Sequence, residues 1–195
     1  IILLKRNIKF LNQIKKLIKD IRKFTKDKKF PVLIDEEGKT VTRLNGIIKN
    51  NFTQKFFGDL YKFKPKEAIK FYEIYIDNIC KVLNNIGINL NTVPVLDVLT
   101  KKTHKIIGKR SFSNDPKIVK KLGEICVNRY KKNKIGTVVK HIPGHGSASS
   151  DSHFFTPRVK LGSKILLKND FFPFVKNKSL FAMTAHVIYK SFDRH

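Results

Sequence analysis

Apolar residues recur along this chain with two different periods. Short apolar runs bounded by polar or turn-forming residues predict five strands, at 1–4, 31–35, 88–98, 137–142 and 179–189. Apolar positions three and four residues apart predict helices over 11–24, 65–83, 116–130 and 163–178. Between the second strand and the second helix lies a long polar stretch, in which Gly38, Gly46 and Gly58 are expected to mark turns.

Alternating strands and helices predict a parallel sheet with helices packed on it. Polar residues follow several different strands, among them Asp35, Asp97, Lys140, His141 and His186. Barrel enzymes assemble their sites from many strand ends at one rim, whereas a Rossmann-type sheet needs a glycine-rich turn that the first strand here lacks. A complete (β/α)8 barrel usually takes ~250 residues. We therefore expect residues 1–195 to form one α/β domain, an incomplete (β/α)8 barrel that lacks its first and last strands.

The net charge of +26 would attract polyanions, but the lysines are spread along every predicted helix. No zinc-finger spacing or RNP-type aromatic pattern accompanies them, so a specific nucleic-acid partner is not expected. The apolar runs are too short to span a membrane, and the first of them meets Lys5 and Arg6 at once, unlike a signal peptide. Cys80 and Cys126 fall within helical apolar patterns and predict buried free thiols in a reducing compartment, hence a cytoplasmic protein.

Half of the six histidines lie in residues 140–157, and residues 142–157 carry no helical or strand periodicity, which predicts a loop. Asp151 stands two residues before His153, so in an extended segment its carboxylate can orient the imidazole for proton transfer. Zinc binding by this loop is a second reading, although the spacing lacks the usual helix or cysteine pair. A polar loop with incidental histidines is a third reading; His145 alone suits a structural role, and His186 could be a core histidine.

Five segments in series resemble the bacterial β-N-acetylglucosaminidases of glycoside hydrolase family 3. They are "LIDEEGKTVTRL" (33–44), "NTVPVLDV" (91–98), "GKRSFSNDP" (108–116), "KHIPGHGSASSDSH" (140–153) and "MTAHVIY" (183–189). The resemblance implies that His153 is the general acid/base and Asp151 its partner. It also implies four substrate-binding residues: Asp35, Arg110, Lys140 and His141.

By the same resemblance, the substrate is a carbohydrate with a terminal β-linked N-acetylglucosamine, such as a peptidoglycan fragment. Hydrolysis would retain configuration through a covalent glycosyl-aspartate, with no metal and no cofactor. Most glycosidases use two carboxylates for this chemistry, and here an imidazole would replace one of them.

The chain departs from the family pattern in three ways. Glu36 replaces a glutamine, and Gly38-Lys39-Thr40 replaces Gly-Gly-Arg, so an arginine contact is lost that Arg43 cannot be assumed to restore. The family's first strand has no counterpart before Ile1, and its nucleophilic aspartate would lie beyond His195. We therefore expect the 195 residues alone to turn over negligibly. A non-catalytic polyanion- or glycan-binding fragment and a metal-dependent hydrolase are the alternative functions.

Overall fold

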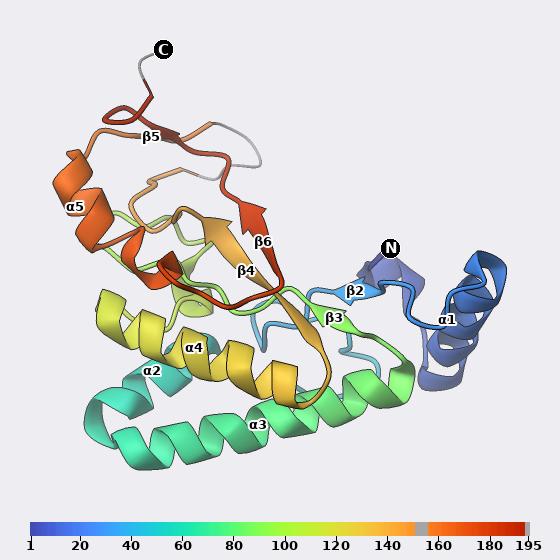
Figure 1. The fold of residues 1–195 in the computed structure, drawn as a ribbon. Helices are drawn as coiled ribbons and strands as arrows, with labels where there is room; N and C mark the ends of the chain where they lie inside the picture. Colours follow the sequence, from blue (N-terminus) through green and yellow to red (C-terminus); the bar gives the residue numbers. More distant parts are fainter. Residues whose placement is uncertain (151–155, 194–195) are drawn as a thin grey trace.

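A five-stranded parallel sheet forms the centre of the computed structural model, which describes residues 1–150 and 156–193 (Figure 1). Its strands, in spatial order, are β1 (Ile2–Leu3), β2 (Leu33–Ile34), β3 (Leu90–Asn91), β4 (Gly136–Ile142) and β6 (Phe181–Thr184). Each strand pairs with the next one in parallel. Such pairing requires crossover connections, which the helices supply. The predicted α/β class is therefore confirmed.

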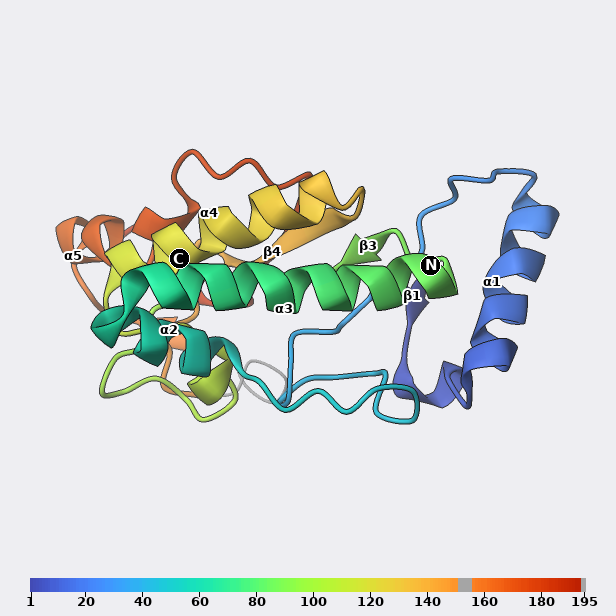
Figure 2. The same cartoon turned by 90° about the horizontal axis from the view of Figure 1, so that it is seen from below.

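Three amphipathic helices match the periodic segments. They are α1 (Leu11–Thr25), α3 (Pro65–Ile86) and α4 (Pro116–Lys132), with the short η1 (Lys5–Asn7) before α1 and η2 (Gly108–Arg110) before α4. Proline occupies the first turn of both α3 and α4, where its missing N–H costs no hydrogen bond. Figure 2 shows α3 and α4 running side by side under the sheet, and α1 standing beyond the carboxyl end of α3.

The polar stretch contains a helix that the sequence pattern did not predict, α2 (Gln54–Phe63). Thr53 caps it by accepting a hydrogen bond from the N–H of Phe56 at 3.2 Å. Gly58 is helical rather than a turn residue: a Cβ there would lie 1.8 Å from the carbonyl oxygen of Phe112. The prediction of a turn was wrong because this glycine serves close packing between segments that are distant in sequence.

The helix predicted over 163–178 is shorter than expected. It consists of α5 (Ser163–Lys168) and, after a break, η3 (Phe172–Phe174). Pro173 lies in η3, and the preceding Asp170 is fully buried, where it accepts hydrogen bonds from the backbone and hydroxyl of Ser147. The buried carboxylate thus lies two residues after the end of α5, within the break between the two helices.

Two of the predicted strands, 88–98 and 179–189, are also divided. The segment 88–98 is a strand only at β3, and Val95 then forms a single bridge with Lys140. The segment 179–189 gives β6 and then β7 (Ile188–Tyr189). The latter pairs with β5 (Arg158–Val159), which was not predicted, in a separate two-stranded sheet.

The main core lies between the sheet and its helices. Both cysteines are buried in it as predicted, and burial raises the pKa of the Cys126 thiol to about 12. A cluster of aromatic rings joins Phe57 of α2, Tyr72 of α3 and Phe112, which follows η2. Among the described residues, no helix has the length and apolar character that crossing a membrane requires.

Candidate active site

The polar residues at the strand ends meet at one edge of the sheet. Asp35 follows β2 directly, and Lys140 and His141 lie near the end of β4, where its pairing with β6 shifts register between Lys140 and Ile142. Arg110 closes η2, which follows the β3 segment. Because parallel strands end at the same edge, four residues from three connections converge there, as the sequence predicted.

Glu37 holds two of these cations in place. Its carboxylate accepts two hydrogen bonds from Arg110, at 2.8 and 2.9 Å, and lies 2.5 Å from the Nζ of Lys140. Both the Glu37 and the Lys140 side chains are only 3% exposed. Burial would raise the pKa of Glu37, but the charges of Lys140 and Arg110 outweigh it and hold that pKa below its ordinary value. The carboxylate is therefore ionised and fixes the orientation of the guanidinium.

Asp35 is the carboxylate of this cluster that reaches solvent. It accepts hydrogen bonds from Thr92 at 2.6 Å and from Arg43 at 2.8 Å, and the Nζ of Lys140 lies 3.6 Å away. Burial opposes its ionisation, yet the Lys140 charge and these hydrogen bonds lower its pKa overall. Arg43, whose role the sequence left open, thus contacts Asp35.

A second pair joins a buried carboxylate to an imidazole. Oδ2 of Asp97 lies 2.6 Å from Nδ1 of His141, and Oδ1 accepts the backbone N–H groups of His141 and His145 at 3.3 and 2.7 Å. Asp97 is fully buried, which would raise its pKa, but the charge of His141 and these hydrogen bonds lower it. Nε2 of His141 lies 3.4 Å from a guanidinium nitrogen of Arg110. Asp97 therefore fixes which nitrogen of His141 faces outward.

Two glutamates of this site were not singled out as functional by the sequence. Glu36 is buried and accepts hydrogen bonds from the Thr42 hydroxyl, the Asn50 amide and the backbone N–H groups of Arg43 and Leu44. It anchors the loop that carries Arg43. Burial raises its pKa despite those hydrogen bonds. The signal for both glutamates was an unusual run of three acids directly after a strand, in a chain with only 15 acidic residues.

A cavity of about 310 Å³ opens beside the Arg110–His141 pair. Its lining consists of Ile106, Ile107, Arg110, His141, His145, Met183, Thr184, Ala185 and His186. Its volume lies at the lower end of the range of small-ligand sites, about 300–1,000 Å³. His186 is exposed and lines this cavity, so its interpretation as a core histidine was wrong. His145 is 3% exposed, and burial lowers the pKa of its imidazole.

The two predicted catalytic residues, Asp151 and His153, lie outside the described residues. The segment that precedes them is anchored near the cavity. Gly144 has a φ of +138°, and its carbonyl accepts a hydrogen bond from the Tyr189 hydroxyl. A Cβ at Gly146 would lie 1.9 Å from the carbonyl oxygen of Val98, so this position requires glycine.

No group of three or more histidine, cysteine or acidic side chains in residues 1–150 and 156–193 has the geometry to hold a metal ion.

Comparison with known proteins gives one consistent result. Residues 1–195 match the family described as Glycosyl hydrolase family 3 N terminal domain. A beta-hexosaminidase of Actinobacillus succinogenes is 32% identical over 99% of this chain and 56% of its own length. Beta-hexosaminidase A of Pseudoalteromonas piscicida is 34% identical over 83% of this chain and 27% of its own length.

A solved structure gives the same answer for the fold. NagZ from Neisseria gonorrhoeae, crystallised in complex with N-trifluoroacetyl-D-glucosamine, superposes with a TM-score of 0.89 at 27% identity. The match covers 98% of this chain and 57% of NagZ. The predicted fold class, an incomplete (β/α)8 barrel, is thereby confirmed. The chain spans about half the length of NagZ and of the Actinobacillus relative.

Proposed function

Because this chain belongs to the glycosyl hydrolase family 3 N-terminal domain family, we propose that it carries the sugar-binding edge and the acid/base of a retaining β-N-acetylglucosaminidase. The observation that supports this proposal is the cluster of Asp35, Glu37, Arg110 and Lys140 at the carboxyl edge of the sheet. The substrate is a terminal β-linked N-acetylglucosamine, and peptidoglycan fragments in the cytoplasm are its source.

The cluster suits recognition of sugar hydroxyls. A hydroxyl is both donor and acceptor, so it is satisfied best by a carboxylate and a cationic donor side by side. Asp35 is ionised and 14% exposed, and Lys140 lies 3.6 Å from it. Arg110 is held by two hydrogen bonds to Glu37, so it presents its remaining N–H groups without losing further side-chain freedom.

The proton transfers would belong to Asp151 and His153. His153 would protonate the leaving oxygen while an aspartate outside these 195 residues attacks the anomeric carbon. His153 would then remove a proton from the water that releases the sugar. In this mechanism Asp151 orients the imidazole and favours its protonated form before the first step.

Two comparisons test this proposal. The protein expressed from its complete reading frame should hydrolyse an aryl N-acetyl-β-glucosaminide, and residues 1–195 alone should not. His153→Ala in the complete protein should slow the substrate with a poor leaving group by orders of magnitude and slow an activated aryl substrate much less. Only the poor leaving group needs a proton. Equal losses on both substrates, or full activity of residues 1–195 alone, would contradict the proposal.

A further inference from the structure

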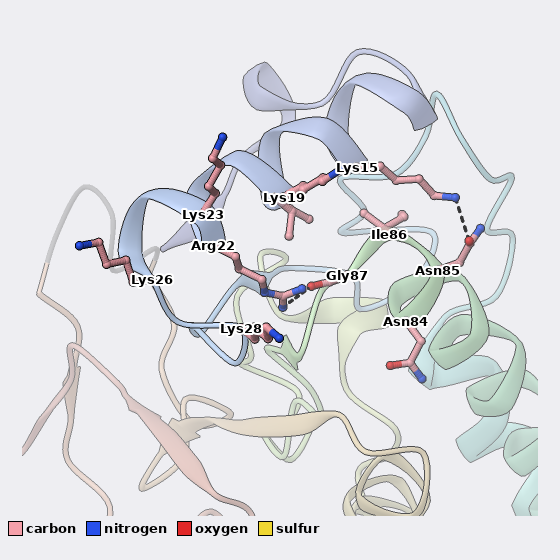
Figure 3. Close-up of a pocket in the computed structure, with 11 residues that line it drawn as sticks. Lys15, Lys19, Arg22, Lys23, Lys26, Lys28, Asn84, Asn85, Ile86 and Gly87 are labelled. Atoms are coloured by element: carbon pink, nitrogen blue, oxygen red, sulfur yellow. Dashed lines mark hydrogen bonds between the residues drawn. The ribbon is translucent and has the colours of Figure 1, made fainter.

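A second and larger cavity, of about 550 Å³, lies between α1 and the carboxyl end of α3 (Figure 3). Its lining consists of Lys15, Ile18, Lys19, Arg22, Lys23, Lys26, Lys28, Asn84, Asn85, Ile86 and Gly87. Both walls of this cavity belong to described residues. We call it the basic groove.

The basic groove lies at the opposite end of the sheet from the candidate active site. Lys26 and Lys28 follow α1 and precede β2, and Gly87 follows α3 and precedes β3. These connections enter the strands at their amino ends, whereas Asp35 and His141 lie at the carboxyl ends. A ligand in the groove would therefore not compete with a sugar at the active site.

The cations of the groove have little acidic neutralisation. No acidic side chain lines it, although Asp20 and Asp27 belong to the same segment of chain. Lys15 donates to the side-chain oxygen of Asn85 at 2.8 Å and Arg22 to the carbonyl of Gly87 at 2.7 Å, both neutral acceptors.

The other four cations of the groove extend into solvent. They are Lys19, Lys23, Lys26 and Lys28, all exposed, and none of them forms an ion pair with a described residue. Elsewhere on the surface, cations do form ion pairs: Lys55 pairs with Asp59, and Arg129 pairs with Asp77. The four groove lysines thus remain available to an anion.

The arrangement of these charges is linear. From Lys15 to Lys23 the cations follow α1 at intervals of about one turn, and this stretch of helix rises about 12 Å. Lys26 comes directly after the helix. In Figure 3, Lys15 and Arg22 are directed toward the end of α3, whereas Lys23 and Lys26 extend from α1 into solvent. A row of this length matches several successive charges on one ligand rather than a single small anion.

The floor of the groove offers no surface on which a nucleic-acid base could stack. It contains Ile18, Ile86 and two asparagine amides, and no aromatic side chain lines the groove. Single-stranded nucleic acids are usually held by bases stacked on aromatic rings, and the groove offers no such surface. Its lining therefore favours phosphate groups over bases.

The guanidinium of Arg22 is held in place at the end of α3. Its Nη2 is held by the Gly87 carbonyl, while its Nε is buried and has no hydrogen-bond partner among the described residues. Gly87 has a φ of +97°, and a Cβ there would lie 3.1 Å from Nη1 of Arg22. The glycine thus leaves room for the guanidinium to lie across the end of α3.

We propose that the basic groove binds a linear phosphate polymer through its phosphate oxygens. The lysines of α1 contact successive phosphates, and Arg22 contacts one at the carboxyl end of α3. This binding is independent of the glycosidase function, because it uses neither the strand ends nor any residue of the candidate active site.

The test compares two variants with the same loss of charge in the protein expressed from its complete reading frame. The first is Lys19→Gln/Lys23→Gln/Lys26→Gln/Lys28→Gln in the groove. The control removes four exposed lysines of α4: Lys117→Gln/Lys121→Gln/Lys131→Gln/Lys132→Gln. Inorganic polyphosphate of about 20 units is the probe, and its dissociation constant is measured from 50 to 200 mM salt.

The groove variant should bind polyphosphate at least tenfold more weakly, and its salt slope should fall by about 3, as expected for four lost phosphate contacts. The α4 variant should change affinity less than threefold. Equal losses in both variants would show that the net charge alone attracts the polymer and would overturn the proposal. Unchanged polyphosphate binding by the groove variant would also overturn the proposal. So would a finding that the groove binds a single-stranded oligonucleotide, or anionic lipid vesicles, more tightly than it binds polyphosphate.

Discussion

Replacing Asp97 by asparagine tests whether a buried carboxylate orients the imidazole at the active-site edge. Asparagine has nearly the same shape, so the cavity and the fold keep their packing. Its amide nitrogen, however, donates where the carboxylate accepted. If that amide faces Nδ1 of His141, the ring proton moves to Nε2, which lies 3.4 Å from a donor nitrogen of Arg110. Two donors then oppose each other at the cavity wall.

The size of the effect follows from the interactions lost. Asp97 accepts hydrogen bonds at 2.6, 2.7 and 3.3 Å, and it is fully buried. A hydrogen bond to a charged group contributes about 1.5–3 kcal/mol, and each ~1.4 kcal/mol is a factor of ten in rate. Asp97→Asn should therefore lower kcat/KM by roughly 10- to 150-fold.

The assay is steady-state hydrolysis of an aryl N-acetyl-β-glucosaminide by the complete protein between pH 4.5 and pH 8. Because Asp97 orients His141, which we propose as a substrate-binding residue, KM should rise. Asp77→Asn, which breaks an ion pair on the helices, is the control and should leave kcat/KM unchanged. If Asp97→Asn stays within twofold of the wild type at every pH, the orienting role is refuted.

Three further predictions concern stability. Glu37→Gln should destabilise the fold by about 3 kcal/mol or more in urea titrations, because it removes the buried negative charge that Lys140 and Arg110 share. A loss below about 1 kcal/mol would contradict that. Gly58→Ala should cost about 2 kcal/mol or more through its clash with a backbone carbonyl, whereas Gly162→Ala, with nothing within 4 Å of its Cβ, should change stability little. The pKa of Asp77 is lowered to about 2 by its arginine partner, so its stabilisation is complete above about pH 4 and fades as the pH falls towards 2. The melting temperature of Asp77→Asn should thus lie slightly below that of the wild type at pH 6, and this difference should shrink as the pH falls through 2.

The elements that the sequence predicted well are those that bury one face. A helix such as α3 places its apolar residues at helical spacing because the sheet covers one side of it, and that spacing is visible without any structure. The helix α2 was missed because Gly58 was interpreted as a turn residue, and the reason for the glycine is a contact with Phe112, more than fifty residues away. A contact of that range leaves no local signal.

In the candidate site, too, some features could be predicted from the sequence and others could not. Asp35, Lys140 and His141 could be placed together because each lies at or just after the carboxyl end of a parallel strand, and topology alone brings such ends to one edge. Which acid pairs with which cation was not predictable: the run Asp35-Glu36-Glu37 offers three carboxylates, and only the fold assigns Glu37 to Arg110 and Lys140. The acid/base assignment to Asp151 and His153 stays a prediction.

The pairing of carboxylates with cations at the sheet edge determines how the candidate active site responds to the salt concentration. Asp35, Glu37 and Asp97 nearly balance Arg43, Arg110 and Lys140, so the excess positive charge of the molecule lies elsewhere, largely on its outer helices. An uncharged glycoside therefore meets an almost neutral pocket in a strongly cationic protein. Raising the salt concentration from 50 to 200 mM screens the interactions of exposed charges but barely alters those between paired, buried charges. Turnover of a neutral substrate should therefore be nearly insensitive to the salt concentration.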